Sequence, residues 1–141
     1  MVYESFSRED TFELGKSLGV KAKAGKVYLL NGDLGVGKTV FTKGFAVGLG
    51  ITEPVNSPTF TILQVYEEGR LPLYHFDTYR IEDSYEMDEI GYDEYVYGEG
   101  VSLIEWPERI DDILPDKAVK IDIKKDLDKG FDYRRIEILE D

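Results

Sequence analysis

Residues 27–49 have the sequence VYLLNGDLGVGKTVFTKGFAVGL. Four apolar residues, Val27–Leu30, follow a glycine and a lysine, and such a short apolar run predicts a buried strand. In Thr39–Leu49, two phenylalanines and a leucine recur every four positions, which predicts a helix with one apolar face. A glycine-rich turn joins the two elements, so this part of the chain indicates an α/β fold.

The turn matches the pattern G-x-x-x-x-G-K-[ST], which is typical of phosphate-binding loops. Glycines lack a Cβ atom, so the backbone can wrap around a phosphate and direct several N–H groups toward it. The N-terminus of the following helix adds partial positive charge beneath the anion. We therefore expect the whole motif to bind nucleotide phosphates: Gly32, Asp33, Leu34, Gly35, Val36, Gly37, Lys38 and Thr39.

Two residues of the motif carry side-chain chemistry. Lys38 supplies a full positive charge for the β- and γ-phosphates, and the hydroxyl of Thr39 is the expected Mg²⁺ ligand. The sequence contains no N-K-x-D segment, which guanine-specific proteins of this class usually carry, so ATP is favoured over GTP. The predicted cofactors are ATP and Mg²⁺.

Two acidic residues are candidates for the metal carboxylate. Asp77 follows the apolar stretch Leu73–Phe76, and Glu105 follows Val101–Ile104. The carboxyl end of a strand beside the phosphate loop is where a magnesium ligand belongs. The residues alone leave both acids open, and each is equally an ordinary surface acid at the end of a strand.

Length and composition bound the rest of the interpretation. The chain has 141 residues, of which 42% are apolar, and this predicts one domain over residues 1–141 with a packed core. Twenty-nine acidic and 17 basic side chains leave a formal charge of −12. So negative a surface disfavours broad contact with nucleic acid, and we expect any contact with RNA to be indirect, through a second protein.

Several classes of protein are excluded by what the sequence lacks. There is no cysteine, which excludes disulfides and zinc–sulfur sites, and His75 is the single histidine. No apolar run approaches the roughly 18–20 residues of a membrane span, and residues 1–10 lack the basic-then-apolar order of a signal peptide. We expect a cytoplasmic protein with no membrane partner.

The remaining elements predict a mixed sheet. Ser7-Arg8-Glu9-Asp10 has the form of a capping box, which predicts a helix ending near Gly19. A four-residue gap containing glycine separates two β-rich stretches and predicts an antiparallel hairpin; parallel pairing is expected where helices intervene. The other predicted elements are the hairpin strands Thr59–Tyr66 and Leu71–Phe76, a short helix from Asp83 or Ser84 to Gly91, and strands Val101–Ile104, Val119–Ile123 and Tyr133–Leu139.

Four segments of the chain resemble the TsaE (YjeE) family, the small P-loop ATPases of bacterial tRNA threonylcarbamoyladenosine (t6A) synthesis. They follow the family's order and spacing over about residues 7 to 139. The resemblance implies a P-loop NTPase-like, three-layer α/β domain with a mixed parallel and antiparallel sheet. The four segments are the loop motif 32–39, Ser57-Pro58-Thr59-Phe60-Thr61, His75-Phe76-Asp77-Thr78-Tyr79-Arg80 and Leu103-Ile104-Glu105-Trp106-Pro107.

The resemblance also implies roles for individual residues. Thr39 and Glu105 would hold the magnesium ion. Ser57-Pro58-Thr59 would be a switch segment, in which Thr59 senses the γ-phosphate. Asp77 would then be a catalytic or water-orienting carboxylate, and Lys38 would act with it in catalysis.

The resemblance places further residues around the site, and for each of them a purely structural role is the alternative. Trp106 is a site or partner residue, or a core aromatic. Arg134 lies near the nucleotide, or is a solvated charge at a strand edge. Arg8 and Thr11 border the adenine, or only begin a helix. Tyr79-Arg80 serve a partner surface, or simply pack.

The function implied is a Mg²⁺-dependent ATPase of t6A synthesis that acts on a TsaB–TsaD partner. Phosphoryl transfer depends on positive charge around the γ-phosphate, and a partner's arginine can supply it. The few, scattered arginines of this chain predict low intrinsic activity. The alternatives are a P-loop small-molecule kinase, which needs an acceptor pocket and a basic lid, and a non-catalytic binding module gated by nucleotide.

Overall fold

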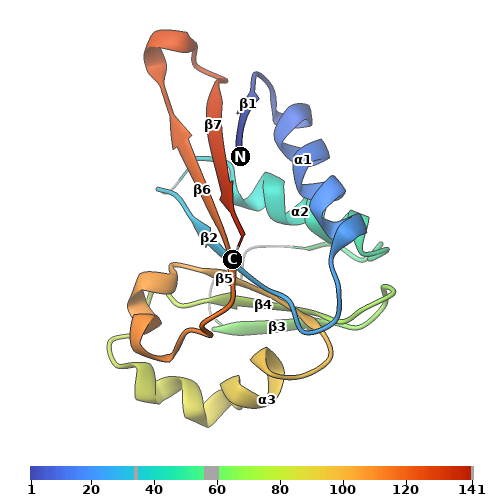
Figure 1. Cartoon of the computed structure of the whole chain (residues 1–141), viewed down its shortest axis with the longest axis vertical. Coiled ribbons are helices and arrows are strands. Elements are labelled where there is room, and N and C mark those ends of the chain that lie inside the picture. Colours follow the sequence, from blue (N-terminus) through green and yellow to red (C-terminus); the bar gives the residue numbers. More distant parts are fainter. Residues whose placement is uncertain (34, 56–60, 141) are drawn as a thin grey trace.

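The computed structural model describes residues 1–33, 35–55 and 61–140, and a seven-stranded sheet forms its centre (Figure 1). The strand order is β1-β7-β6-β2-β5-β4-β3. The strands are β1 (Val2–Ser5), β2 (Val27–Asn31), β3 (Leu63–Tyr66), β4 (Leu73–Asp77), β5 (Val101–Glu105), β6 (Val119–Lys125) and β7 (Arg134–Leu139).

The sheet combines parallel and antiparallel pairing, as the sequence predicts. In its centre, β2 pairs in parallel with β5 and with β6, and β4 pairs in parallel with β5. The hairpin β3–β4 is antiparallel, as are the pairs β6–β7 and β1–β7. The sheet twists strongly, so that β6, β7 and β1 run steeply across the direction of β3, β4 and β5 (Figure 1).

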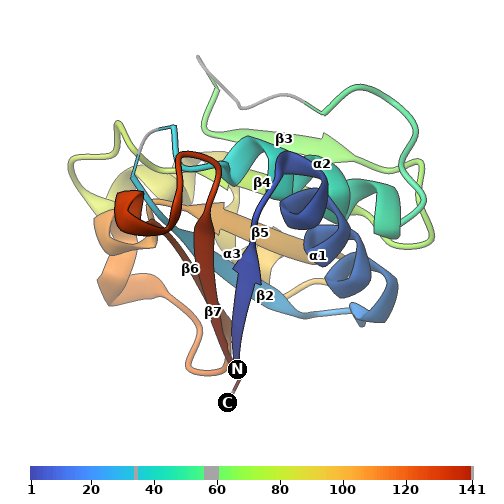
Figure 2. The same cartoon turned by 90° about the horizontal axis from the view of Figure 1, so that it is seen from above.

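Helices cover both faces of the sheet. On one face lie α1 (Arg8–Lys21) and α2 (Lys38–Gly48), which pack together beside the strands (Figure 2). On the other face lie the 3₁₀ helices η1 (Ser84–Ile90) and η2 (Pro107–Ile113) and the short helix α3 (Tyr92–Val96). A third 3₁₀ turn, η3 (Leu127–Lys129), lies between β6 and β7.

The central strand β2 explains why its sequence is continuously apolar. Tyr28 and Leu30 pack with α2 in one core cluster, while Val27 and Leu29 pack with the short helices in the other. A strand covered on both faces needs apolar residues at every position. The buried strand predicted from Val27–Leu30 is therefore confirmed, one residue longer at its carboxyl end.

The helices α1 and α2 approach each other through glycines. A Cβ atom added at Gly15 or Gly19 of α1 would overlap a backbone carbonyl of α2, and one added at Gly44 or Gly48 of α2 would overlap a carbonyl of α1. This packing also corrects the expected end of α1, which runs to Lys21. Gly19 allows α1 to approach α2 closely, and it does not terminate the helix.

We expect Gly44→Ala to lower the free energy of unfolding by roughly 1–3 kcal/mol, the cost of overpacking a filled interior. The new methyl group would overlap the carbonyl oxygen of Phe12, so the two helices must move apart. For a chain of this length the loss corresponds to a Tm lower by roughly 3–10 °C. Thermal unfolding followed by circular dichroism measures it.

The matched control for this variant is Lys43→Ala, at the preceding position of α2, where the side chain is exposed. Its Tm should stay close to that of the unchanged chain. Equal Tm values for Gly44→Ala and Lys43→Ala would contradict the glycine packing described above.

Other differences from the predicted elements have local causes. The strand expected over Thr59–Tyr66 is observed over Leu63–Tyr66. Thr59 and Phe60, the first two residues of the expected strand, lie outside the described part of the chain. The helix capped by Asp83 is a 3₁₀ helix, and α3 follows it directly after Gly91. Strand β1 has mostly exposed side chains, so no apolar pattern marks it; pairing with β7 forms it.

Candidate functional site

The glycine-rich motif forms the connection between β2 and α2. Gly35 and Gly37 have φ angles of 77° and 108°, a left-handed backbone that other residues adopt only with strain. A Cβ atom at either position would meet no atom within 4 Å among the described residues. The glycines are thus required by the backbone conformation and leave open space above the loop. Leu34 lies outside the described residues.

Lys38 is the first residue of α2, and its side chain is only 7% exposed. Its Nζ atom lies 3.9 Å from Oε1 of Glu105 and 3.8 Å from the ring centre of Trp106. Within the described residues this buried Nζ makes no hydrogen bond. Burial lowers the pKa of Lys38, while the nearby carboxylates, led by Glu105 and Asp77, oppose that change. An ammonium held in this way is stabilised by an anion that enters the cleft.

The two candidate acids end neighbouring strands. Asp77 is the last residue of β4 and Glu105 the last of β5, and the two are paired in the register of the sheet. Glu105 is buried, and its Oε2 lies 2.6 Å from Nε2 of His75. Asp77 is half-buried and accepts a hydrogen bond of 3.0 Å from the backbone N–H of Tyr79. Burial raises the pKa of Asp77, with a smaller contribution from the charge of Glu105.

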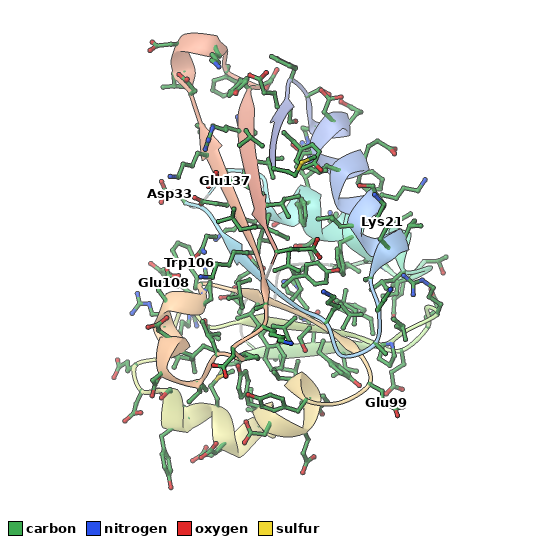
Figure 3. The ribbon with its side chains drawn as sticks, viewed as in Figure 1. Lys21, Asp33, Glu99, Trp106, Glu108 and Glu137 are labelled. Carbon is green, nitrogen blue, oxygen red and sulfur yellow. The ribbon has the colours of Figure 1, made fainter. Side chains whose placement is uncertain are left out.

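A cleft of about 260 Å³ joins the loop to these acids. The structure therefore brings together six residues that the sequence predicts as site residues, besides Trp106 at its rim. Asp33 is exposed on the same side of the molecule as Trp106 and Glu108 (Figure 3). The residues that line the cleft are Gly35, Gly37, Lys38, Thr39, Asp77, Glu105 and Trp106.

Trp106 is half-buried against the cleft, and is therefore not a fully buried core aromatic. With φ of 58° it is the only residue other than glycine that has a left-handed backbone in the described ranges. The hydroxyl of Thr78 donates to the carbonyls of Glu105 and Trp106, at 2.9 and 2.6 Å, and holds this turn. The ring of Tyr79 lies 4.8 Å from the Trp106 ring, and Arg109 lies 5.5 Å from Tyr79. Sequence analysis assigned no role to Thr78 or to Arg109.

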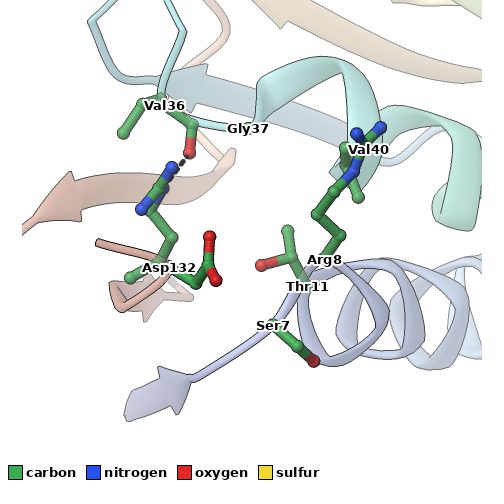
Figure 4. Close-up of a pocket in the computed structure, with 8 residues that line it drawn as sticks. Ser7, Arg8, Thr11, Val36, Gly37, Val40 and Asp132 are labelled. Atoms are coloured by element: carbon green, nitrogen blue, oxygen red, sulfur yellow. Dashed lines mark hydrogen bonds between the residues drawn. The ribbon is translucent and has the colours of Figure 1, made fainter. Parts of the chain in front are cut away.

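A second, smaller hollow lies beside the loop (Figure 4). Arg8 and Thr11, from the start of α1, line it together with Val36, Gly37 and Arg134. The guanidinium of Arg134 donates from Nε to the carbonyl of Val36 at 2.7 Å. The three outlying residues predicted to contact ATP thus meet beside the phosphate loop. The hydroxyl of Thr11 lies 2.7 Å from that of Ser5, so it already has a hydrogen-bond partner.

Three further predicted residues are not among the described residues that line the cleft. Ser57 and Thr59, the expected switch segment, lie outside the described residues. Arg80 is exposed and follows Tyr79. In contrast, His75 contacts Glu105, although sequence analysis assigned it no role at the site. The signal that could have found it is a polar residue at a core position of an apolar strand.

The described residues contain no helix with the length and apolar character that would let it cross a lipid bilayer. They also contain no cluster of three or more histidine, cysteine or acidic side chains arranged to hold a metal.

The fold and the site define an α/β protein that carries a phosphate-loop motif between β2 and α2, with acids at the ends of β4 and β5. Residues 5–136 match the model of the family described as threonylcarbamoyl adenosine biosynthesis protein TsaE. The chain belongs to the TsaE family.

Similar proteins support this assignment. The tRNA threonylcarbamoyladenosine biosynthesis protein TsaE of Bacillus subtilis is 50% identical over 134 residues, which is 95% of this chain and 82% of that protein. The TsaE protein of Treponema pallidum is 48% identical over 85% of this chain and 88% of its own length. The crystal structure of Bacillus subtilis YdiB superposes with a TM-score of 0.86 at 43% identity, covering 99% of this chain and 84% of that one.

Proposed function

We propose that this chain is a Mg²⁺-dependent ATPase of the P-loop NTPase kind, with a three-layer domain, that serves t6A synthesis in the cytoplasm together with the proteins TsaB and TsaD. The observation that carries the proposal is the state of Lys38. Its ammonium is buried at the start of α2, makes no hydrogen bond within the described residues, and faces a cleft beside two strand-end acids.

The residues present fit a nucleoside triphosphate. The loop glycines leave space above the backbone. The first N–H groups of a helix such as α2 have no partner within the helix, so they would be available to a phosphate there. Lys38 lies within the same cleft and would bind the terminal phosphates. Arg8, Thr11 and Arg134 would border the nucleoside end, because they meet beside Val36 and Gly37.

The residues present also fit a magnesium ion that is held mainly by phosphates and water. Magnesium usually takes only one or two protein carboxylates in such sites, which agrees with the absence of a larger ligand cluster among the described residues. Thr39 and Glu105 line the same cleft and would hold the ion. When bound, the ion neutralises negative charge on the β- and γ-phosphates.

Asp77 would orient the attacking water and accept its proton. It lines the cleft beside Glu105, and its Oδ1 is fixed by the N–H of Tyr79. Its raised pKa suits proton acceptance better than that of a freely exposed aspartate, because a stronger base takes a proton more readily.

Partner proteins would complete the site. The described residues that line the cleft include Lys38 but no arginine, so the second positive charge that speeds phosphoryl transfer would come from another chain. We assign that role to the TsaB–TsaD pair, with tRNA contacted only indirectly. The proposed contact residues are Trp106, which lines the cleft, and the exposed Tyr79, whose ring packs against that of Trp106.

Titration calorimetry with Mg·ATP and ATP-turnover assays, with and without TsaB and TsaD, test this function. We expect binding by the chain alone, slow turnover, and faster turnover with both partners. Absence of heat and of any Tm shift with Mg·ATP would exclude the proposal. Transfer of labelled phosphate to a metabolite would support a kinase instead, and tight binding without turnover in the full mixture would support a nucleotide-gated module.

A further inference from the structure

A buried polar pair, His75–Glu105, lies at the cleft that Glu105 lines. Nε2 of His75 lies 2.6 Å from Oε2 of Glu105, and the two side chains are 1% and 5% exposed. An ionised carboxylate can only accept a hydrogen bond, so His75 donates to Glu105 through Nε2–H. Within the described residues, Nδ1 of His75 makes no hydrogen bond. The ring thus has one polar contact there, and that contact is with Glu105.

The two oxygens of Glu105 have different surroundings. Oε2 is held by His75, whereas Oε1 lies 3.9 Å from Nζ of Lys38. A lysine and a carboxylate that are free to close on each other form bonds of about 2.7–2.9 Å. The direction of the Glu105 carboxylate is therefore set by the histidine, and Oε1 remains turned toward Lys38 and the cleft.

A contribution to stability alone does not account for this pair. Removing two polar side chains from water is costly, and apolar residues of similar volume at such positions usually leave a fold as stable or make it more so. His75 lies on β4 between Tyr74 and Phe76, in a strand whose other core positions are apolar. The partner of this polar residue is Glu105, which lines the cleft, so the pair points toward that site.

We infer that His75 is a positioning residue for magnesium: it holds Glu105 so that one carboxylate oxygen is presented to the ion bound in the cleft. This inference rests on the proposed function, because Glu105 is the proposed metal ligand. Hydrogen bonds from such outer partners orient carboxylate ligands, and their loss typically weakens metal binding by roughly 10- to 100-fold.

The test compares ATP affinity with and without the metal. The coupling ratio is the dissociation constant of ATP measured in EDTA divided by the dissociation constant measured at saturating MgCl₂. By linkage, this ratio equals the affinity of Mg²⁺ for protein-bound ATP divided by its affinity for free ATP. Any effect of a substitution on the nucleotide itself cancels in this ratio. Calorimetry on the full chain measures both constants, and Tm values report folding.

For His75→Leu we expect the coupling ratio to fall by roughly 10-fold or more, toward one. His75→Gln should restore it to within about threefold, because its amide nitrogen can reach the position of Nε2 and donate the same bond. Ser102→Ala is the matched control. It removes another buried polar group of the same region, from β5, whose Oγ makes no hydrogen bond within the described residues.

Each outcome decides the inference. A folded His75→Leu protein with an unchanged ratio would overturn it, and so would a His75→Gln protein as defective as His75→Leu. If His75→Leu does not fold, His75→Asn replaces it, since that shorter amide cannot reach Glu105. A ratio near one in the unchanged chain would instead overturn the proposed Mg²⁺ dependence itself, so the two failures are distinguishable.

Discussion

Replacing Asp77 by asparagine is expected to lower kcat for ATP hydrolysis by roughly 10²- to 10⁴-fold, the contribution of a positioned general base. Asparagine keeps the oxygen that accepts the N–H of Tyr79, so the turn after β4 should persist. It cannot take a proton from water. ATP binding should therefore stay within a few-fold of normal, and single-turnover hydrolysis in the presence of TsaB and TsaD measures the loss.

The pH dependence gives this prediction a second readout. Burial raises the pKa of Asp77, so the ionised form that accepts a proton is lost at a higher pH than for an exposed aspartate. The rate of hydrolysis by the unchanged chain should decline as the pH falls through that raised pKa. The pH–rate profile of the Asp77→Asn variant should lack this acid-side decline. The matched control is Glu108→Gln, which removes an exposed negative charge nearby. A variant that loses binding and turnover equally would assign Asp77 to binding.

Replacing Lys38 by alanine is expected to weaken ATP binding by roughly 10- to 150-fold, which corresponds to about 1.5–3 kcal/mol for a hydrogen bond to a charged group. The ammonium is buried beside Glu105 and Trp106, and no other lysine or arginine lines the described part of the cleft. Without it, the carboxylates of Glu105 and Asp77 would face the phosphates uncompensated. Calorimetry with Mg·ATP measures the change.

Lys43→Ala provides the control for this loss of charge. Lys43 lies on the same helix, five residues further on, with an exposed side chain. It should bind Mg·ATP as the unchanged chain does. If the Lys38 and Lys43 variants bind equally well, the ammonium at the start of α2 has no part in nucleotide binding.

The sequence predicts the site best where neighbouring residues form it. The apolar run before the glycines and the periodic helix after them are local patterns, so β2, the loop and α2 follow from residues 27–49. The acids at 77 and 105 were found because each ends an apolar stretch. Their pairing depends on which strands are neighbours, and the resemblance, not the spacing, supplied separate roles for them.

Other features depend on contacts between distant residues, which no local pattern encodes. Arg134 bonds the carbonyl of Val36, 98 positions away in the sequence. His75 can contact Glu105 only because β4 lies beside β5 in the sheet. The end of α1 was misplaced because a glycine permits both termination and close packing, and only the position of α2 distinguishes the two.

The register of β4 and β5 has a consequence for how this protein can change. Because Asp77 and Glu105 are paired across parallel strands, the gap between their backbones is the interstrand spacing of about 4.8 Å, whatever the connecting chain does. Within the crossover, exposed positions such as Tyr97 and Glu99 could then accept insertions or exchanges without changing that gap. Such exposed positions of the crossover are accordingly where a reporter peptide or a new binding loop can be grafted without moving the backbones of Asp77 and Glu105 apart.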